Sequence, residues 1–270
     1  IRYNIRYELD RGSNSSLNAT YYDVNKNTMK LRHPSKNNYE FIGWYSSKDE
    51  AEEASRIAVQ NQIVERKKAM GASDEEAGQI KELPKESYLS ELTLDKAIKL
   101  SVCTNNRYEM KLYAAWRPHV YSVTYHLNSS DGRFENETSS DRTLVIRKDA
   151  KSPEEDTVTK FYQVDETGKF IGDTVNTTQG NVYRSGYRLG RWTTKANNSG
   201  SAYAGDRNFS NLSYADGQAI HLYAQWSLAT YRITYEYNGG RNPGNSGAYN
   251  VNSDKIVLKD SSKNYSKFIG

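Results

Sequence analysis

The chain has 270 residues, which is long enough for more than one domain, each with a modest core. Its 37 basic and 33 acidic residues give a net charge of +4 and form no basic block, which argues against nucleic-acid binding. No apolar run approaches the roughly 20 residues of a membrane-spanning helix, and a single cysteine, Cys103, excludes an internal disulfide.

Three short phrases recur in a fixed order along the chain. The first alternates large apolar residues with polar ones and predicts a strand. The second combines an aromatic residue with Gly and Trp, and the third reads Leu-Tyr-Ala-x-Trp. The copies of the strand phrase lie at 3–9, 121–127 and 231–237, those of the Gly–Trp phrase at 38–44, 186–192 and, incomplete, 265–270, and those of the closing phrase at 112–116 and 222–226.

This internal similarity predicts a tandem-repeat array. We expect a first repeat at residues 1–119, a second at 120–229 and the start of a truncated third at 230–270. Short connectors between the repeats leave little slack, so neighbouring units are expected to stack in series.

Two insertions interrupt the repeat frame. In the first, at about 48–104, Ser47 and Ser73 each precede a Glu by three positions, which predicts capping boxes that open two helices. A third helical stretch follows from Leu94, so we expect a small helical subdomain. The second insertion, at about 143–182, contains two strand-like runs and is expected to extend a sheet.

The sequence offers no set of residues for catalysis or cofactor binding. The four histidines are scattered and lack the spacing of metal ligands. No glycine-rich phosphate loop occurs, so we expect no catalytic residue, no cofactor and no metal. We interpret Cys103 as a buried small side chain near a helix end rather than as a reactive thiol.

The aromatic residues allow two interpretations. The tryptophans recur in register with the strand phrases, and we interpret them as core residues, because small units need large side chains to bury enough surface. Three further aromatic residues stand in a less regular Gly- and Asn-rich segment. They are the candidates for stacking on a glycan: Tyr203, Phe209 and Tyr214.

The ordered phrases resemble the Listeria–Bacteroides repeat, or internalin-type B repeat, of cell-wall and secreted proteins in bacteria, especially Gram-positive ones. The residues that carry the resemblance are Tyr39, Phe41, Gly43, Trp44, Leu112, Tyr113, Trp116, Tyr187, Trp192, Leu222, Tyr223 and Trp226. Gly190 falls one position early in the second repeat, which leaves its local strand geometry open. The resemblance implies tandem β-grasp-like (ubiquitin-like) α+β units, use at the cell surface and no enzymatic activity.

These features favour a non-enzymatic extracellular segment of a bacterial surface protein or adhesin, at the cell surface or cell wall. It would act as a monomeric stalk or spacer that also contacts a host glycan, matrix or surface protein. One alternative is a module whose insertions recognise a glycan or a protein. Another is an accessory region of a secreted enzyme.

Overall fold

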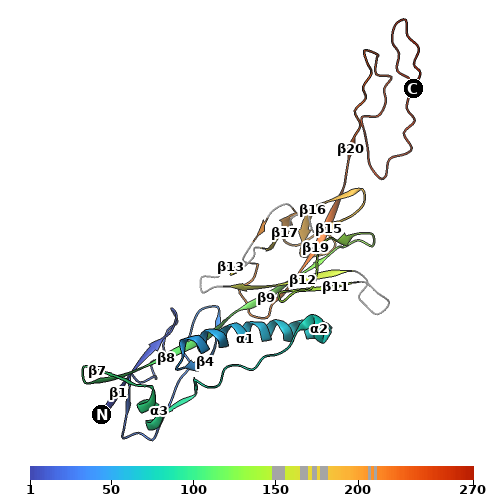
Figure 1. Cartoon of the computed structure of the whole chain (residues 1–270). Helices are drawn as coiled ribbons and strands as arrows, with labels where there is room; N and C mark the ends of the chain where they lie inside the picture. The colour runs from blue at the N-terminus through green and yellow to red at the C-terminus, as the bar shows by residue number, and fades with distance from the viewer. Residues whose placement is uncertain (148–155, 165–169, 172–174, 177–181, 206–207, 210–211) are drawn as a thin grey trace.

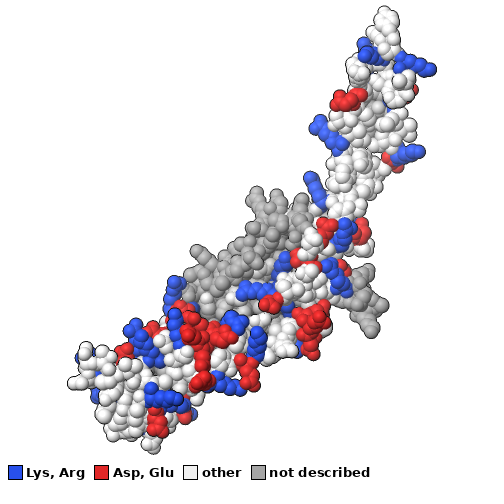
Figure 2. All heavy atoms as spheres, in the orientation of Figure 1, with Lys and Arg blue, Asp and Glu red and all other residues white. Residues whose placement is uncertain are grey.

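The computed structural model describes residues 1–270 except 148–155, 165–169, 172–174, 177–181, 206–207 and 210–211. The molecule is elongated: two strand-rich units, here called the first unit (1–119) and the second unit (120–229), lead into a thin C-terminal segment (230–270; Figure 1). Strands predominate and helices are few, so the fold is of the α+β class. Acidic and basic side chains are interspersed on the face of the two units drawn in Figure 2.

One mixed sheet forms the frame of the first unit. Its strands are β1 (Arg2–Glu8), β2 (Tyr21–Asp23), β4 (Tyr39–Tyr45), β5 (Tyr88–Leu89), β7 (Val102–Thr104) and β8 (Arg107–Pro118). The order is β2-β1-β8-β4-β5, with β7 also paired to β8. The strand phrase, β1, runs parallel to the closing strand β8, while β4 is antiparallel to β8 on its other side. A separate pair joins β3 (Thr28–Lys30) and β6 (Glu91–Thr93).

The second unit repeats this frame. Its main sheet contains β9 (Val120–His126), β11 (Thr143–Ile146), β12 (Thr157–Val164), β13 (Phe170–Ile171), β16 (Tyr187–Thr193), β17 (Ala202–Ala204) and β19 (Ala219–Leu228). The order is β11-β12-β9-β19-β16-β17, with β9 parallel and β16 antiparallel to β19. Two further pairs are β10 (Arg133–Phe134) with β15 (Val182–Tyr183), and β14 (Val175–Asn176) with β18 (Asn208–Phe209). Strand β12 lies beside β9 as β2 lies beside β1, and β11 extends the sheet beyond it; other parts of the second insertion lie outside the described residues.

The two units share their strand register as well as their order. Trp44 pairs with Ala114 and Trp192 with Ala224, which are equivalent positions of the closing phrase. Each middle strand also carries one extra residue, Ile42 in β4 and Gly190 in β16. Such a bulge bends a strand and strengthens its local twist. The early glycine of the second repeat therefore occupies the bulge and leaves the frame unchanged.

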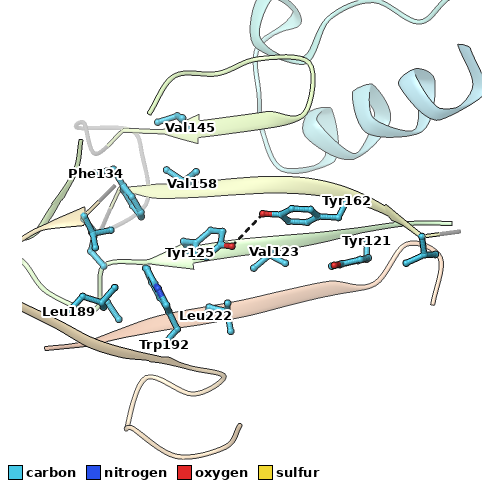
Figure 3. Close-up of a cluster of buried hydrophobic side chains, with 14 residues drawn as sticks. Tyr121, Val123, Tyr125, Phe134, Val145, Val158, Tyr162, Leu189, Trp192 and Leu222 are labelled. Carbon is cyan, nitrogen blue, oxygen red and sulfur yellow. Dashed lines mark hydrogen bonds between the residues drawn. The ribbon is translucent and has the colours of Figure 1, made fainter. Parts of the chain in front are cut away.

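Aromatic residues fill the cores of both units. Trp44, Trp116 and Trp192 are buried, and Trp226 packs half-buried against the second core. Figure 3 shows Trp192 directed toward Tyr125, edge to face at 5.1 Å between ring centres. The hydroxyls of Tyr125 and Tyr162, also drawn there, lie 3.4 Å apart.

The closing tryptophans are anchored alike in both units. The Trp116 indole N–H donates to the Leu9 carbonyl at 3.0 Å, and that of Trp226 donates to the Leu127 carbonyl at 2.7 Å. The bond ties the end of the closing strand to the end of the strand phrase. It also satisfies a polar group that burial would otherwise leave without a partner.

The first insertion contains a helix at each of the three places where the sequence predicts one, together with short strands. Its helices are α1 (Lys48–Ala69), α2 (Asp74–Ala77) and α3 (Leu94–Leu100). Ser73 with Glu76 forms the full capping box of α2, as the sequence predicts. At α1 only the Ser47 half of the predicted box forms, because the Glu50 carboxylate accepts from Ser87 instead. Strands β5 and β7 of the insertion join the main sheet and β6 pairs with β3, so the insertion is built into the first unit instead of forming a separate subdomain. The interpretation of Cys103 as a buried residue at a helix end is wrong, because it lies exposed in β7.

The C-terminal segment has little regular structure. Its strands β20 (Tyr231–Arg232) and β21 (Ala248–Tyr249) pair with each other, and isolated bridges join Arg241 to Ser262 and Lys263 to Ser266. Large apolar side chains stay exposed along it, including Val257, Leu258 and Ile269. It contrasts with the two packed units that precede it.

Candidate functional site

The contact between the two units is the most elaborate polar arrangement in the described part of the chain, and α1 builds most of it. Figure 1 shows α1 lying beside β4 and β8 at its start and reaching the second unit at its end. Ala51 and Ala54, in the first turns, pack against Tyr45 and Ala115 of the first sheet. Small side chains at these positions let the helix approach the strands closely.

The second half of α1 packs on the other unit. Val59 and Ile63 form a cluster with Val120, Leu144 and Phe161, which belong to β9, β11 and β12. This apolar contact is shared by both units, since burying it removes surface from each. The helix therefore packs on both sheets and connects them, instead of covering only one.

Arg66 of α1 binds the second unit through its guanidinium. It donates to the carbonyls of Val120 at 3.0 Å and of Gly217 and Gln218 at 3.1 Å each, and to the Ser122 hydroxyl at 2.8 Å. Five fixed donors make arginine suited to such a set of acceptors. The guanidinium thus holds the start of β9 and the loop before β19 to the same helix.

Lys67 is the most deeply buried charged residue among those described, with 1% of its surface exposed. Its ammonium donates to the carbonyl of Ser140 in the second unit and, at 3.4 Å, to that of Glu76. Burial lowers the pKa of Lys67, and the charges of Asp141 and Glu76 oppose that change. The methylene stem packs while the charged end finds acceptors on both sides of the contact.

Asp216 accepts hydrogen bonds from residues of both units. Gln62 of α1 donates to its two carboxylate oxygens at 3.0 and 3.1 Å, and the Val120 amide donates to one of them at 2.8 Å. Arg117, at the end of β8, makes a two-pronged bond to the same carboxylate at 2.8 and 3.1 Å and also binds Glu40. Burial by itself raises the pKa of Asp216, but the hydrogen bonds from Arg117, Gln62 and Val120 outweigh it and lower the pKa to about 2.

The covalent link between the units is short and held on both sides. Only His119 separates β8 from β9. Its amide donates to the Asn38 carbonyl at 2.8 Å, its own carbonyl accepts from the Val164 amide at 3.1 Å, and its imidazole lies 2.9 Å from the Tyr214 carbonyl. We call this whole contact, formed by α1, Arg117, His119 and Asp216, the junction.

The remaining candidates are the three aromatic residues considered for glycan stacking. Tyr203, on edge strand β17, packs partly buried against the second core, whereas Tyr214 is exposed beside the junction. Phe209 belongs to β18, where it pairs with Val175, and its side chain lies outside the described residues. Stacking of these residues on a glycan stays a prediction.

The histidines include one close pair. His126 Nε2 and His221 Nδ1 lie 2.9 Å apart on the parallel strands β9 and β19, and His126 stacks on Tyr223 at 4.5 Å between ring centres. Burial, with a smaller contribution from the neighbouring imidazole, lowers the pKa of His221. Within the described residues, no group of three or more His, Cys, Asp or Glu side chains could hold a metal ion.

Sequence reasoning missed the polar residues of the junction. Gln62 and Arg66 are four positions apart and share one face of α1, a pattern that could have marked a contact surface. Nothing in the repeat phrases pointed to Asp216, because its partners lie about a hundred positions away in the chain.

Comparison with known proteins agrees with the repeat frame. Residues 3–64 match the family model of the Listeria–Bacteroides repeat domain, a range that spans the strand phrase, the Gly–Trp phrase and most of α1. No curated protein and no solved structure matches the chain. No helix among the described residues is long and apolar enough to cross a membrane. The chain therefore carries a Listeria–Bacteroides repeat domain at residues 3–64.

Proposed function

We propose that this chain is a non-enzymatic repeat segment of a bacterial cell-surface protein, and that it acts outside the cell as a stiff spacer. The family match supports use as a surface-protein repeat region. The observation that carries the spacer role is the junction, where a one-residue link, an apolar cluster and a partly buried ionic network join two units.

The physical argument concerns bending. Units joined by a flexible linker sample many relative orientations, so their separation varies. A joint braced by a 22-residue helix must break several hydrogen bonds and expose apolar surface before it can bend. Such a joint turns a chain of small units into an element of defined reach.

We further infer that each unit is β-grasp-like. A central parallel pair, formed by the first and last strands, is flanked on both sides by antiparallel strands in both units. The segment between β2 and β4 contains β3 and no helix, so it corresponds to a crossing loop. The first unit's main helix lies instead after β4, within the insertion.

This architecture also bears on the alternative in which the insertions recognise a ligand. The first insertion supplies α1 to the junction and β5 to the sheet, so a structural role already accounts for most of its buried surface. Deleting residues 48–104 would disrupt the frame along with any binding site. Adhesion is therefore better tested with surface substitutions than with deletions.

Electron-spin distance measurements test the spacer role. A nitroxide on the native Cys103 and a second on Lys195→Cys would report the separation of the units. We expect a narrow distance distribution for the parent chain and a clearly broader one for the double variant Arg66→Ala/Asp216→Ala. Glu65→Ala, on the exposed side of α1, serves as the control and should leave the width unchanged. A broad distribution in the parent chain would refute the stiff spacer.

A further inference from the structure

A small cavity lies between α1 and the second unit, beside the junction. Its volume is about 290 Å³, at the lower end of the range for small-molecule sites. One wall is a stripe along α1, formed by the side chains of Arg56, Val59, Gln60 and Ile63. The other wall is the turn before β11 and the end of β12, which supply Asp141, Arg142 and Gln163. Both units therefore contribute side chains to one cavity.

Two polar side chains of the second unit reach this cavity without a hydrogen-bond partner among the described residues. The Arg142 carbonyl accepts from the Phe161 amide at 2.9 Å, which holds the backbone in place, but the Arg142 guanidinium bonds none of these residues. Gln163 is only 7% exposed, and its side-chain amide likewise bonds none of them. A buried amide without a partner costs free energy. A ligand that accepts a hydrogen bond from Gln163 would remove that cost.

The charges around the cavity leave one arginine uncompensated. Arg56 is already bound through two nitrogens to Glu53, at 2.6 and 2.8 Å. The charge of Asp141 acts on Lys67, where it opposes the lowering of the lysine pKa by burial. Each of these two pairs is neutral as a whole. Arg142 therefore carries the one positive charge of the lining that no carboxylate among the described residues offsets.

We propose that this cavity binds a small organic monocarboxylate. The Arg142 guanidinium would hold the carboxylate with two parallel N–H donors, and the Gln163 amide would donate to one of its oxygens. Val59 and Ile63 would pack against a compact apolar body. A single uncompensated positive charge favours a monoanion over a doubly charged phosphate.

The position of the cavity gives binding a consequence for the junction. The donors belong to the second unit and the apolar wall to α1, so a bound ligand would contact both units. A ligand that binds only the joined arrangement stabilises it by mass action. The site thus goes beyond the spacer role, which requires no ligand.

A titration followed by nuclear magnetic resonance tests the proposal. The probe is sodium benzoate, added at constant ionic strength to the isotope-labelled full chain, and benzamide is the uncharged control of the same shape. We expect a saturable shift of the Gln163 side-chain amide signal with benzoate and much weaker binding of benzamide, because only a carboxylate pairs with the Arg142 guanidinium. Absence of a saturable shift, or equal affinity for the two compounds, would overturn the proposal.

Two arginines provide a matched pair of chain variants. Arg142→Gln and Arg188→Gln remove the same charge from exposed positions of the second unit, but Arg188 lies on β16 and does not line the cavity. Arg142→Gln should weaken benzoate binding roughly tenfold or more, and Arg188→Gln should leave it unchanged. Equal binding by the two variants would overturn the assignment.

The spin-label distance measurement tests the contact with both units. Saturating benzoate should narrow the distance distribution of the Arg66→Ala/Asp216→Ala chain, and benzamide at the same concentration should not. An unchanged width at saturation would overturn the bridging site. The spacer role is judged separately, from the width that the parent chain shows without any ligand.

Discussion

At the scale of single residues, Asp216 stabilises the junction although its own side chain is partly exposed. Its carboxylate is 29% exposed, yet it is bonded to Arg117, which is only 9% exposed. Removing Asp216 would leave the buried guanidinium with Glu40 alone of these two carboxylates, and losing a partner in this way costs more than the pair itself contributes. One carboxylate therefore stabilises the ends of β8 and α1 and the start of β9 together.

The lowered pKa of Asp216 makes the junction sensitive to acid. The carboxyl group has an ordinary pKa of 3.8 and a pKa of about 2 in the fold, so its stabilising contribution is complete above pH 3.8 and is lost as the pH falls through 2. The contribution amounts to about 1 kcal/mol after allowance for solvent screening. We expect the distribution of distances between labels at Cys103 and Lys195→Cys to broaden as the pH is lowered from 6 to 2.5.

Other carboxyl groups titrate over the same range, so a variant must isolate this one. Asp216→Asn keeps the shape of the side chain but cannot ionise. Its distance distribution should be broader than that of the parent at pH 6 and should change less on acidification. Equal broadening of both chains with acid would assign the effect to groups other than Asp216.

At the scale of elements, α1 shows how one helix serves two sheets. Ala51 and Ala54 face the first unit, and Val59 and Ile63 face the second. Ala54 and Ala115 are both fully buried, so the distance between helix and strand is set by two methyl groups. The position leaves no room for a larger side chain.

Ala54→Leu should therefore displace the helix from the first sheet. Overpacking of this kind costs roughly 1–3 kcal/mol. We expect a lower denaturation midpoint in urea, followed by tyrosine and tryptophan fluorescence. Glu52→Leu, on the exposed side of the same helix, is the matched control and should leave the midpoint nearly unchanged. An unchanged midpoint for Ala54→Leu would mean that the contact between α1 and β8 is loose.

The sequence predicted elements better than contacts between them. Local patterns identified the phrases as strands, the Ser47 cap and the Ser73 box, because each depends on residues a few positions apart. The shared bulge was missed, since Gly190 and Ile42 are unlike residues that occupy the same place. The junction was missed because Arg117 and Asp216 are distant in the chain and neither belongs to a periodic pattern.

At the scale of the whole molecule, the C-terminal segment is less densely packed than the two units before it. The two units are joined by the junction, whereas the C-terminal segment follows β19 with few contacts: the Ala229 amide bonds the Gly186 carbonyl at 2.9 Å, and Val251 packs against Gly186. Segments with few buried apolar contacts open at a lower free energy than a core. The molecule therefore consists of two packed units joined by the junction and a less densely packed C-terminal segment.

Limited proteolysis should reveal this gradient. Chymotrypsin should cleave first after exposed aromatic or leucine residues of the C-terminal segment, such as Leu258 and Tyr265, and leave a long-lived fragment that ends near residue 230. Early cleavage within 48–104, ahead of the C-terminal segment, would show instead that α1 is loosely held. In that case the brace between the units would not be stiff, and the spacer role would lose its structural basis.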